Sequence, residues 1–415
     1  MAGIDRIPAM PVPEIDSDVL LTYCLNVHPG ETTAEVFETL AGPYCQVIET
    51  LSAAGMKAPF AAGLRLGAKA VDAFTRDAGL LTELRETLKN LQSFAPTLNA
   101  FPYGEFHADV VKEDVYRPDW QTNQRRDYTI AAGGLMASLS GPAQKISVST
   151  LPGSFKKFGK HDVKAMGRHI AEVAAAFHRM MNIHGKTIIL AMEPEPGGTF
   201  ETTDEFVHFY EEVLLAETWP SFDDLTGGNK EAAEEIMRQH VGICFDTCHA
   251  AVEFEDPSQS LLLLESRGIQ IGKMQLSSAL HLDNPAQNPE GLAMLATYDE
   301  PRFLHQVMAR GKDLSLSYFD DLGPYLAQAA TRDDLAVRAH FHVPVFADDL
   351  GCGLKTTQDA MRQGLGTSLE RQLTTHFEVE TYSWDLLPER RGAAPSADLP
   401  DLICHELEYV AKFMA

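Results

Sequence analysis

Four apolar segments of the sequence each end in a carboxylate or carboxamide side chain. TIILAME ends at Glu193, VGICFD at Asp246, IGKMQ at Gln275 and THFEVE at Glu380. A short apolar run is typical of a buried parallel strand, whose end can present a polar side chain to a cleft. A buried carboxylate is costly unless it is paired, hydrogen-bonded or bound to a metal. Several such groups at one place therefore indicate a bound cation.

The residue types predict an oxygen-rich metal site. Glu193, Asp246 and Glu380 supply three carboxylates, and Gln275 and His342 are assigned as further ligands. Such a set suits a divalent ion, Mn, Mg, Co or Zn, which is the predicted cofactor. The alternative is that some of the acids pair with basic residues at the strand ends.

Three histidines stand near these acids or on an extended segment. His249 follows Asp246 by about one helical turn, so it can ligate the metal, orient Asp246 or bind substrate. His340 and His342, two residues apart on extended chain, face the same side. The alternative for this pair is a buried, hydrogen-bonded arrangement. We assign His249 and His340 to the substrate.

Further substrate-binding candidates follow the third and fourth predicted strands. Asn99 and Tyr103 lie in TLNAFPYGEFH, and Lys156 lies in the Gly- and Lys-rich turn LPGSFKKFG. A lysine here can bind a phosphate or carboxylate of a ligand. Arg125 and Arg126 are expected on a solvated helix face instead.

The elements that must position these residues alternate between strand and helix. Eight apolar strands are predicted to start near residues 20, 58, 97, 145, 187, 241, 271 and 375. Eight parallel strands separated by helices close a (β/α)8 TIM barrel of the α/β class, whose site lies at the C-terminal mouth of the strands. Every polar strand end would then point into one cleft.

The domain prediction is a single TIM-barrel domain over residues 1–415. It carries insertions at about 220–238 and 282–337 and a C-terminal helix at about 401–414. The second insertion is too long for an ordinary barrel loop, so we expect it to contain helices of its own.

Composition and charge exclude several classes of function. The net charge of -25 disfavours nucleic acid and anionic membrane surfaces as partners. Residues 1–20 lack a secretion signal and no run is long enough to span a bilayer, which predicts a cytoplasmic protein without membrane insertion. The six scattered cysteines are expected to be reduced thiols. A small-molecule metabolite is the expected partner, and a homo-oligomer is an open alternative.

These motifs resemble those of the xylose isomerase-like TIM barrel superfamily, which includes sugar-phosphate isomerases, ketose epimerases and endonuclease IV-type enzymes. ICFDTCHA is similar to its sixth-strand D-x-x-H motif. LAMEPEP and FEVET place Glu193 and Glu380 at the fifth-strand and final-strand glutamates. The resemblance implies the xylose isomerase-like fold and a metal site at these positions.

Two positions depart from that pattern. Gln275 replaces the usual seventh-strand histidine, and Leu151 stands where the endonuclease branch has a metal-binding histidine. These departures disfavour a three-zinc site and still allow a one-metal site, and together with the acidic charge they argue against DNA cleavage.

Eight blocks spread over nearly the whole chain also resemble the EboE family of metabolite-traffic proteins. They are LTYCLNVHPGET, NAFPYGEFH, VYRPDW, MEPEPG, FDTCHA, MQLSSAL, HFHVPVF and EVETYSW. The family is associated with bacterial gene clusters thought to handle or export precursors of secondary metabolites. The resemblance implies a role in metabolite traffic and leaves the reaction open.

Three functions remain in order of preference. The first is a metal-dependent isomerase or epimerase of a sugar-like or polyol-like metabolite, with Glu193 and Glu380 as base and acid. The second is a metabolite-binding or carrier barrel without turnover, which Gln275 in place of histidine favours. The third is a metal-dependent hydrolase or lyase of a phosphorylated metabolite, for which Lys156 and Lys157 would bind the phosphate.

Overall fold

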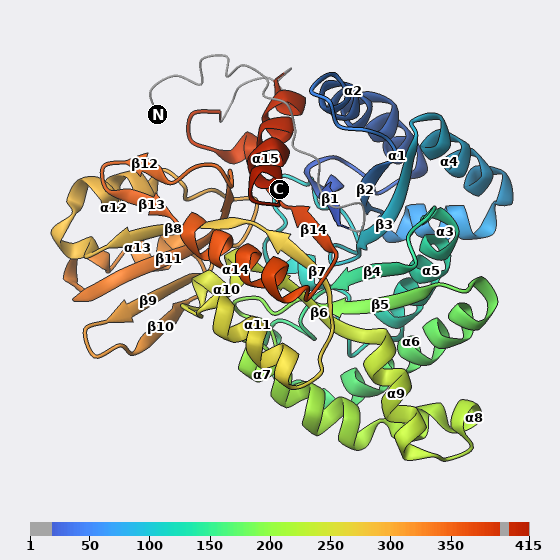
Figure 1. Ribbon diagram of the computed structural model, residues 1–415. Helices are drawn as coiled ribbons and strands as arrows, with labels where there is room; N and C mark the ends of the chain where they lie inside the picture. The colour runs from blue at the N-terminus through green and yellow to red at the C-terminus, as the bar shows by residue number, and fades with distance from the viewer. Residues whose placement is uncertain (1–18, 391–397, 415) are drawn as a thin grey trace.

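Eight parallel strands form the central sheet of the computed structural model, which describes residues 19–390 and 398–414 (Figure 1). The strand order is β1-β14-β7-β6-β5-β4-β3-β2, and a parallel bridge between Cys24 and Gly63 joins the two edge strands into a ring. The strands are β1 Leu20–Tyr23, β2 Phe60–Arg65, β3 Ser93–Asn99, β4 Lys145–Thr150, β5 Thr187–Met192, β6 Val241–Asp246, β7 Ile271–Leu276 and β14 His376–Val379. The predicted (β/α)8 barrel is confirmed.

Helices cover the outside of this ring between successive strands (Figure 1). The longest, α6, starts behind Asp162, whose side chain accepts the Ala165 N–H, and ends at Gly185 in the left-handed conformation. The helices are α1 Thr33–Thr39, α2 Cys45–Ala53, α3 Ala68–Arg76, α4 Ala78–Asn90, α5 Asn123–Leu139, α6 Val163–His184, α7 Thr203–Phe209, α8 Asp223–Thr226, α9 Lys230–His240, α10 Thr247–Val252, α11 Pro257–Ser266, α12 Pro289–Ala296, α13 Leu322–Leu326, α14 Gln358–Arg371 and α15 Leu399–Met414.

None of the described helices combines the length and apolar character needed to cross a bilayer. Residues 1–18, most of the stretch inspected for a secretion signal, lie outside the described residues. All six cysteines are free thiols.

A second, antiparallel sheet stands beside the barrel and is drawn in yellow to orange in Figure 1. Its order is β10-β9-β11-β8-β13-β12. The strands are β8 Ser278–Asp283, β9 Val307–Gly311, β10 Leu316–Phe319, β11 Asp334–Val343, β12 Asp349–Gly351 and β13 Leu354–Thr356. The segment expected to carry helices does contain α12 and α13, but its strands were not predicted.

The apolar run IGKMQLSSAL, predicted as one strand, is two strands in different sheets. It divides at Ser277, so β7 stays in the barrel and β8 starts the antiparallel sheet. After Ser277 the chain leaves the barrel at its mouth and continues as β8. β11 runs antiparallel to β8, so the C-terminal end of β11 lies beside the start of β8 at the same mouth. Each sheet has its own cluster of buried apolar side chains.

A buried ion pair occupies the barrel interior. The Lys273 ammonium and the Glu378 carboxylate are both fully buried and in contact, and Thr22 donates to Glu378 Oε1 at 3.2 Å. Burial lowers the pKa of Lys273, but Glu378, Cys244, Cys24 and Glu380 together outweigh burial, so the pKa is raised. Gly63 makes room for this pair, because a Cβ there would lie 1.9 Å from Glu378 Oε1.

Candidate metal centre

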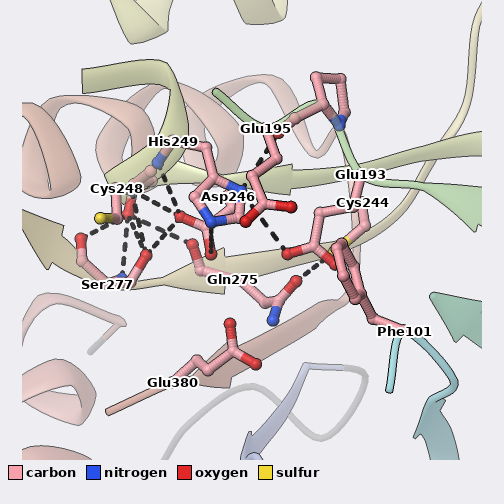
Figure 2. A network of polar contacts seen from close by, with 12 residues as sticks. Phe101, Glu193, Glu195, Cys244, Asp246, Cys248, His249, Gln275, Ser277 and Glu380 are labelled. Carbon is pink, nitrogen blue, oxygen red and sulfur yellow. Dashed lines mark hydrogen bonds and ion pairs between the residues drawn. The ribbon is translucent and has the colours of Figure 1, made fainter. Parts of the chain in front are cut away.

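Three carboxylates from separate strands converge at the mouth of the barrel (Figure 2). Glu193 follows β5, Asp246 ends β6 and Glu380 follows β14, and one oxygen of each lies within 4.8 Å of the others. They are only 2%, 3% and 3% exposed. Oxygens that share one ion through bonds of 2.0–2.6 Å lie at most about 4–5 Å apart. The trio therefore has the spacing of a common ligand set.

Among the described residues, no lysine or arginine forms an ion pair with this trio; a ring nitrogen of His249 lies 3.7 Å from Glu193 Oε1, and one of His342 lies 3.8 Å from Glu380 Oε2. Lys273 pairs with Glu378, and Arg65 pairs with Glu31 at 2.7 Å. Among the described residues, Glu193 Oε2 and Asp246 Oδ2 are buried without a hydrogen-bond partner. A buried carboxylate oxygen without a partner is costly, so a divalent cation fits the donors present.

The pKa values reflect the same crowding. Burial, then Glu380 and then Asp246 raise the pKa of Glu193, and burial followed by Asp246 raises the pKa of Glu380. Burial also raises the pKa of Asp246, but His249, His342 and a hydrogen bond from Ser277 outweigh it, so that this pKa is lowered. Like charges at short range disfavour full ionisation unless a cation joins them.

Asp246 is oriented by the start of α10. Its Oδ1 accepts the N–H groups of Cys248 at 2.6 Å and His249 at 3.1 Å, and the Ser277 hydroxyl at 2.6 Å. One oxygen thus caps the helix and the other stays free. The same cap fixes His249 in the first turn of α10, beside the acids.

Glu380 is oriented by two asparagines at the cavity wall. Asn26 Nδ2 donates to Glu380 Oε1 at 2.7 Å and Asn99 Nδ2 donates to the same oxygen at 2.9 Å. Asn99, predicted to bind substrate, lines the cavity and holds this carboxylate. A carboxylate held by two donors keeps one orientation, as a metal ligand requires.

Gln275 lies between the acids and a buried thiol. Cys244 donates its S–H to Gln275 Oε1 at 2.5 Å, and Gln275 Nε2 has no partner among the described residues. Turning the amide by half a revolution would let Nε2 donate to the sulfur and free the oxygen. Gln275 can therefore serve as a ligand in one of its two amide orientations.

A cluster of three histidines adjoins the carboxylates. His340 Nε2 lies 3.1 Å from His249 Nε2 and 3.2 Å from His342 Nε2. Burial lowers the pKa of all three, that of His249 to about 4. Glu195 lies 3.7 Å from His340 Nδ1, and burial raises its pKa to about 8. The predicted side-by-side placement of His340 and His342 brings both rings into the cavity.

The cavity above these groups has a volume of about 60 Å³ and a largely aromatic wall. Phe101, Phe106, Tyr116, Phe303 and Tyr382 form much of that wall. The one lysine or arginine that lines it, Lys112, is bound to two backbone carbonyl oxygens and to Asp321. Within the described part of the chain, the cavity therefore offers no unpaired cation to an anionic ligand.

Two predicted substrate residues lie elsewhere. Tyr103 lines a neighbouring cavity and packs edge-on against Tyr128. Lys156 forms an ion pair with Glu201 and does not line the cavity with the acids.

The expectation of a solvated Arg125 is wrong. This side chain is fully buried, and its guanidinium donates to the backbone oxygens of Ala100 at 2.7 Å and Pro118 at 2.8 Å.

Several cavity residues were not assigned to the site from the sequence. Glu195 and Tyr382 lie two residues beyond the strand-end glutamates Glu193 and Glu380. In extended chain, residues two apart point to the same side, so this spacing is a weak signal that both side chains also face the cavity. Gln306 lies in the inserted segment, where no local pattern marks it.

Comparison with known proteins gives structural similarity alone. No family model and no curated protein matches the chain. A xylose isomerase-like TIM barrel protein from Mycobacterium smegmatis in complex with magnesium is similar over 95% of this chain and 96% of that one, at 11% identity and a TM-score of 0.50. A D-tagatose 3-epimerase-like protein (11% identity, 95% and 100% covered, TM-score 0.45) and the IolI protein with a bound zinc atom (12%, 95% and 96%, 0.44) also match. The first similarity agrees with the fold described above.

Proposed function

We propose that this chain is a metal-dependent isomerase or epimerase that acts on a small polyhydroxylated metabolite. The observation that carries the proposal is the buried trio Glu193, Asp246 and Glu380, which converges without a lysine or arginine partner among the described residues. Three unpaired acids in one place are costly to stability, and such arrangements are typical of functional sites. The xylose isomerase-like fold is consistent with it.

Glu193, Asp246 and Glu380 would hold the ion, with Gln275 and His342 as further ligands. A divalent ion bound there would polarise a substrate carbonyl and its neighbouring hydroxyl. Mn, Mg, Co and Zn all accept such donors. Each ligand comes from a different strand or loop, so the barrel itself fixes their spacing.

The side chains then move a proton. Glu193 takes the proton from the carbon next to the carbonyl, and the C–H electron pair enters an enediolate. Glu380 enters the step protonated and gives its proton to the opposite face of that carbon or to the neighbouring carbon, and proton exchange with solvent then returns Glu193 to its ionised form and Glu380 to its protonated form. Asn26 and Asn99 hold Glu380 in place during both transfers. The aromatic wall limits the access of water, which strengthens each electrostatic interaction.

Solvent-isotope exchange tests this function. Protein loaded with Mn or Co is incubated in deuterated water with a panel of ketoses and polyol-derived ketones, and deuterium at carbon is measured by mass spectrometry. We expect exchange that Glu193→Gln reduces by about 10²–10⁴-fold, the usual effect of losing a general base. Glu172→Gln, on the barrel's outer helix, is the control and retains exchange. Absence of exchange with every metal and every compound would contradict the proposal.

A carrier without turnover is the second candidate, and Gln275 favours it. The Cys244 thiol donates to the Gln275 amide oxygen. In this orientation of the amide, that oxygen does not bind the metal, and the site has one oxygen ligand fewer. Metal analysis of protein purified without chelators separates the two functions. A carrier predicts substoichiometric metal that Glu193→Ala does not change.

The phosphorylated-substrate hypothesis has no observation in its favour. Lys156 pairs with Glu201 and Lys157 with Asp320, and neither lysine lines the cavity. The eight blocks that resemble the EboE family support a metabolite from secondary metabolism as the substrate or cargo.

A further inference from the structure

One face of the antiparallel sheet carries a row of basic side chains. Residues that pair across neighbouring strands lie on the same face, as do residues two apart on one strand. Ala336 pairs with Arg310, and Arg338 pairs with His281, which in turn pairs with Lys355. The adjacent strands β9, β11, β8 and β13 (Figure 1) therefore place Arg310, Arg338, His281 and Lys355 on one face, in a chain with a net charge of -25.

Phe254 joins the two arginines of this row. Its ring centroid lies 4.5 Å from Arg310 Cζ and 4.3 Å from Arg338 Cζ. It follows the end of α10 with a φ of +58°, a left-handed conformation that glycine usually supplies at this position. The attraction between its ring and the two guanidinium groups offsets part of the cost of this conformation. Phe254 thus holds two positive charges against one ring.

The hydrogen bonds of Arg338 fix its guanidinium in place but leave its charge uncompensated. Its Nη1 donates to the Ala251 carbonyl oxygen at the end of α10, at 2.5 Å, and its Nε donates to His281 Nδ1 at 3.2 Å. It forms no ion pair with any described residue. Burial and then Arg310 lower the pKa of Arg338 to about 10, although Asp283 acts in the opposite direction.

Arg310 has no polar partner within residues 19–390 and 398–414. Its guanidinium forms neither a hydrogen bond nor an ion pair there, and its Nε is buried. Buried donors without a partner are rare in native proteins, and water or a bound ion commonly satisfies them. Asp283, an acid on the same face, is already bound by His281 at 3.1 Å and by Lys355 at 3.8 Å. Two positive charges are therefore left for a ligand.

We propose that Arg310 and Arg338 bind the phosphate group of a small ligand on this face of the antiparallel sheet. Each guanidinium offers a planar fork of N–H donors, and a tetrahedral dianion accepts hydrogen bonds from several directions at once. Both side chains are half-buried, so the ligand is partly shielded from water. Neither arginine lines the cavity above the carboxylates, so this site goes beyond the proposed function and does not depend on it.

Calorimetric titration of the full-length protein with inorganic phosphate tests this site. The protein is first stripped of metal, so that phosphate cannot bind a metal ion, and sodium chloride keeps the ionic strength constant. We expect one phosphate per chain. Arg310→Gln should weaken its binding by about 10–100-fold, the usual effect of losing a hydrogen bond to a charged group.

Arg371→Gln is the matched control for charge. It removes the same charge from an exposed arginine of α14 that is already paired with Glu265 at 2.8 Å, and it should bind phosphate as the unmutated protein does. No phosphate binding by the unmutated protein, or equal affinity in Arg310→Gln and Arg371→Gln, overturns the site. Either result leaves the carboxylate centre standing, because the two sites share no residue.

Glycerol 3-phosphate, titrated in the same way, distinguishes the two sources of a phosphate group. Tighter binding of this ester than of inorganic phosphate supports a phosphorylated metabolite as the ligand, and equal or weaker binding supports free phosphate. If Arg310→Gln does not fold, anomalous scattering from arsenate, a phosphate analogue soaked into unmutated crystals, decides. Density in contact with both guanidinium groups supports the site, and its absence overturns it.

Discussion

The two oxygens of Asp246 have different tasks. Oδ1 accepts three hydrogen bonds, from the Cys248 and His249 N–H groups and from the Ser277 hydroxyl, and so ties β6, α10 and the start of β8 together. Oδ2 is buried among the acids with no partner in the described residues. Structural and metal-binding roles of this one side chain can therefore be separated by substitution.

Asp246→Asn should remove metal binding and retain the fold. The amide oxygen still caps α10, because Asn is as good an N-cap as Asp, while one negative charge of the trio is lost. Asp246→Ala loses the cap as well and should unfold about 1–2 kcal/mol more easily. Urea denaturation of the metal-free proteins and metal titration measure the two effects. Equal destabilisation by both variants, or full metal affinity in Asp246→Asn, would contradict this division.

At the residue scale, prediction succeeded where the signal is local. An apolar run that stops at an acid predicts the end of a parallel strand, and such ends meet at one mouth of a barrel. The sequence therefore predicted that Glu193, Asp246 and Glu380 lie together, as they do in the structure. Lys156 was assigned to the substrate from its place in a Gly- and Lys-rich turn. Its side chain pairs with Glu201 instead, and this contact depends on tertiary packing, which a local pattern does not contain. Arg125 was misplaced because its partners are backbone oxygens, which no residue type reveals.

At the element scale, β11 and α15 close the site from outside the barrel. β11 carries His340 and His342. Glu406, on α15, forms hydrogen bonds with the two chain segments that follow β11 and β14 at the barrel mouth. Glu406 Oε1 accepts the Val345 N–H at 3.0 Å and the Thr381 hydroxyl at 2.7 Å. One buried side chain thus joins the helix to the ends of β11 and β14.

This link should make stability depend on pH. Burial raises the pKa of Glu406 from its ordinary value of 4.5 to about 8. The folded state therefore binds a proton that the unfolded state releases, so stability is fully present below pH 4.5 and falls as the pH rises through about 8. Each unit of difference corresponds to about 1.4 kcal/mol.

Glu406→Gln should flatten this dependence. The amide oxygen can still accept both hydrogen bonds, and no charge forms at high pH, so the variant should gain stability over the unmutated protein between pH 5 and pH 8. Urea midpoints across that range measure it, with the exposed Glu370→Gln as a control that leaves the profile unchanged. A variant with the same pH slope as the unmutated protein would show that Glu406 ionises freely.

At the scale of the whole molecule, the barrel was predictable and the second sheet was not. Parallel strands buried on both faces read as short apolar runs, and their regular alternation with helices gave the eightfold ring. The antiparallel strands β9 and β10 are short and partly exposed, and β8 merges with β7 into one apolar run. Their pairing depends on contacts between distant segments, which local patterns do not contain.

Closure of the ring supplies the last prediction, at Gly63. A Cβ at this position would lie 1.9 Å from Glu378 Oε1 and 2.6 Å from the Tyr23 carbonyl oxygen. Gly63→Ala must therefore move β1 away or displace Glu378 from Lys273, and we expect a loss of about 1–3 kcal/mol, the range for overpacked cores.

Gly42→Ala is the matched control, because a Cβ there meets nothing within 4 Å. It should leave stability unchanged or raise it by up to about 1 kcal/mol. Thermal and urea unfolding of both variants give the comparison. The strands on both sides of the contact between β1 and β2 help to form the barrel mouth, so Gly63→Ala should also weaken metal binding. Equal stability and equal metal affinity in the two variants would contradict this prediction and show that the ring tolerates opening between β1 and β2.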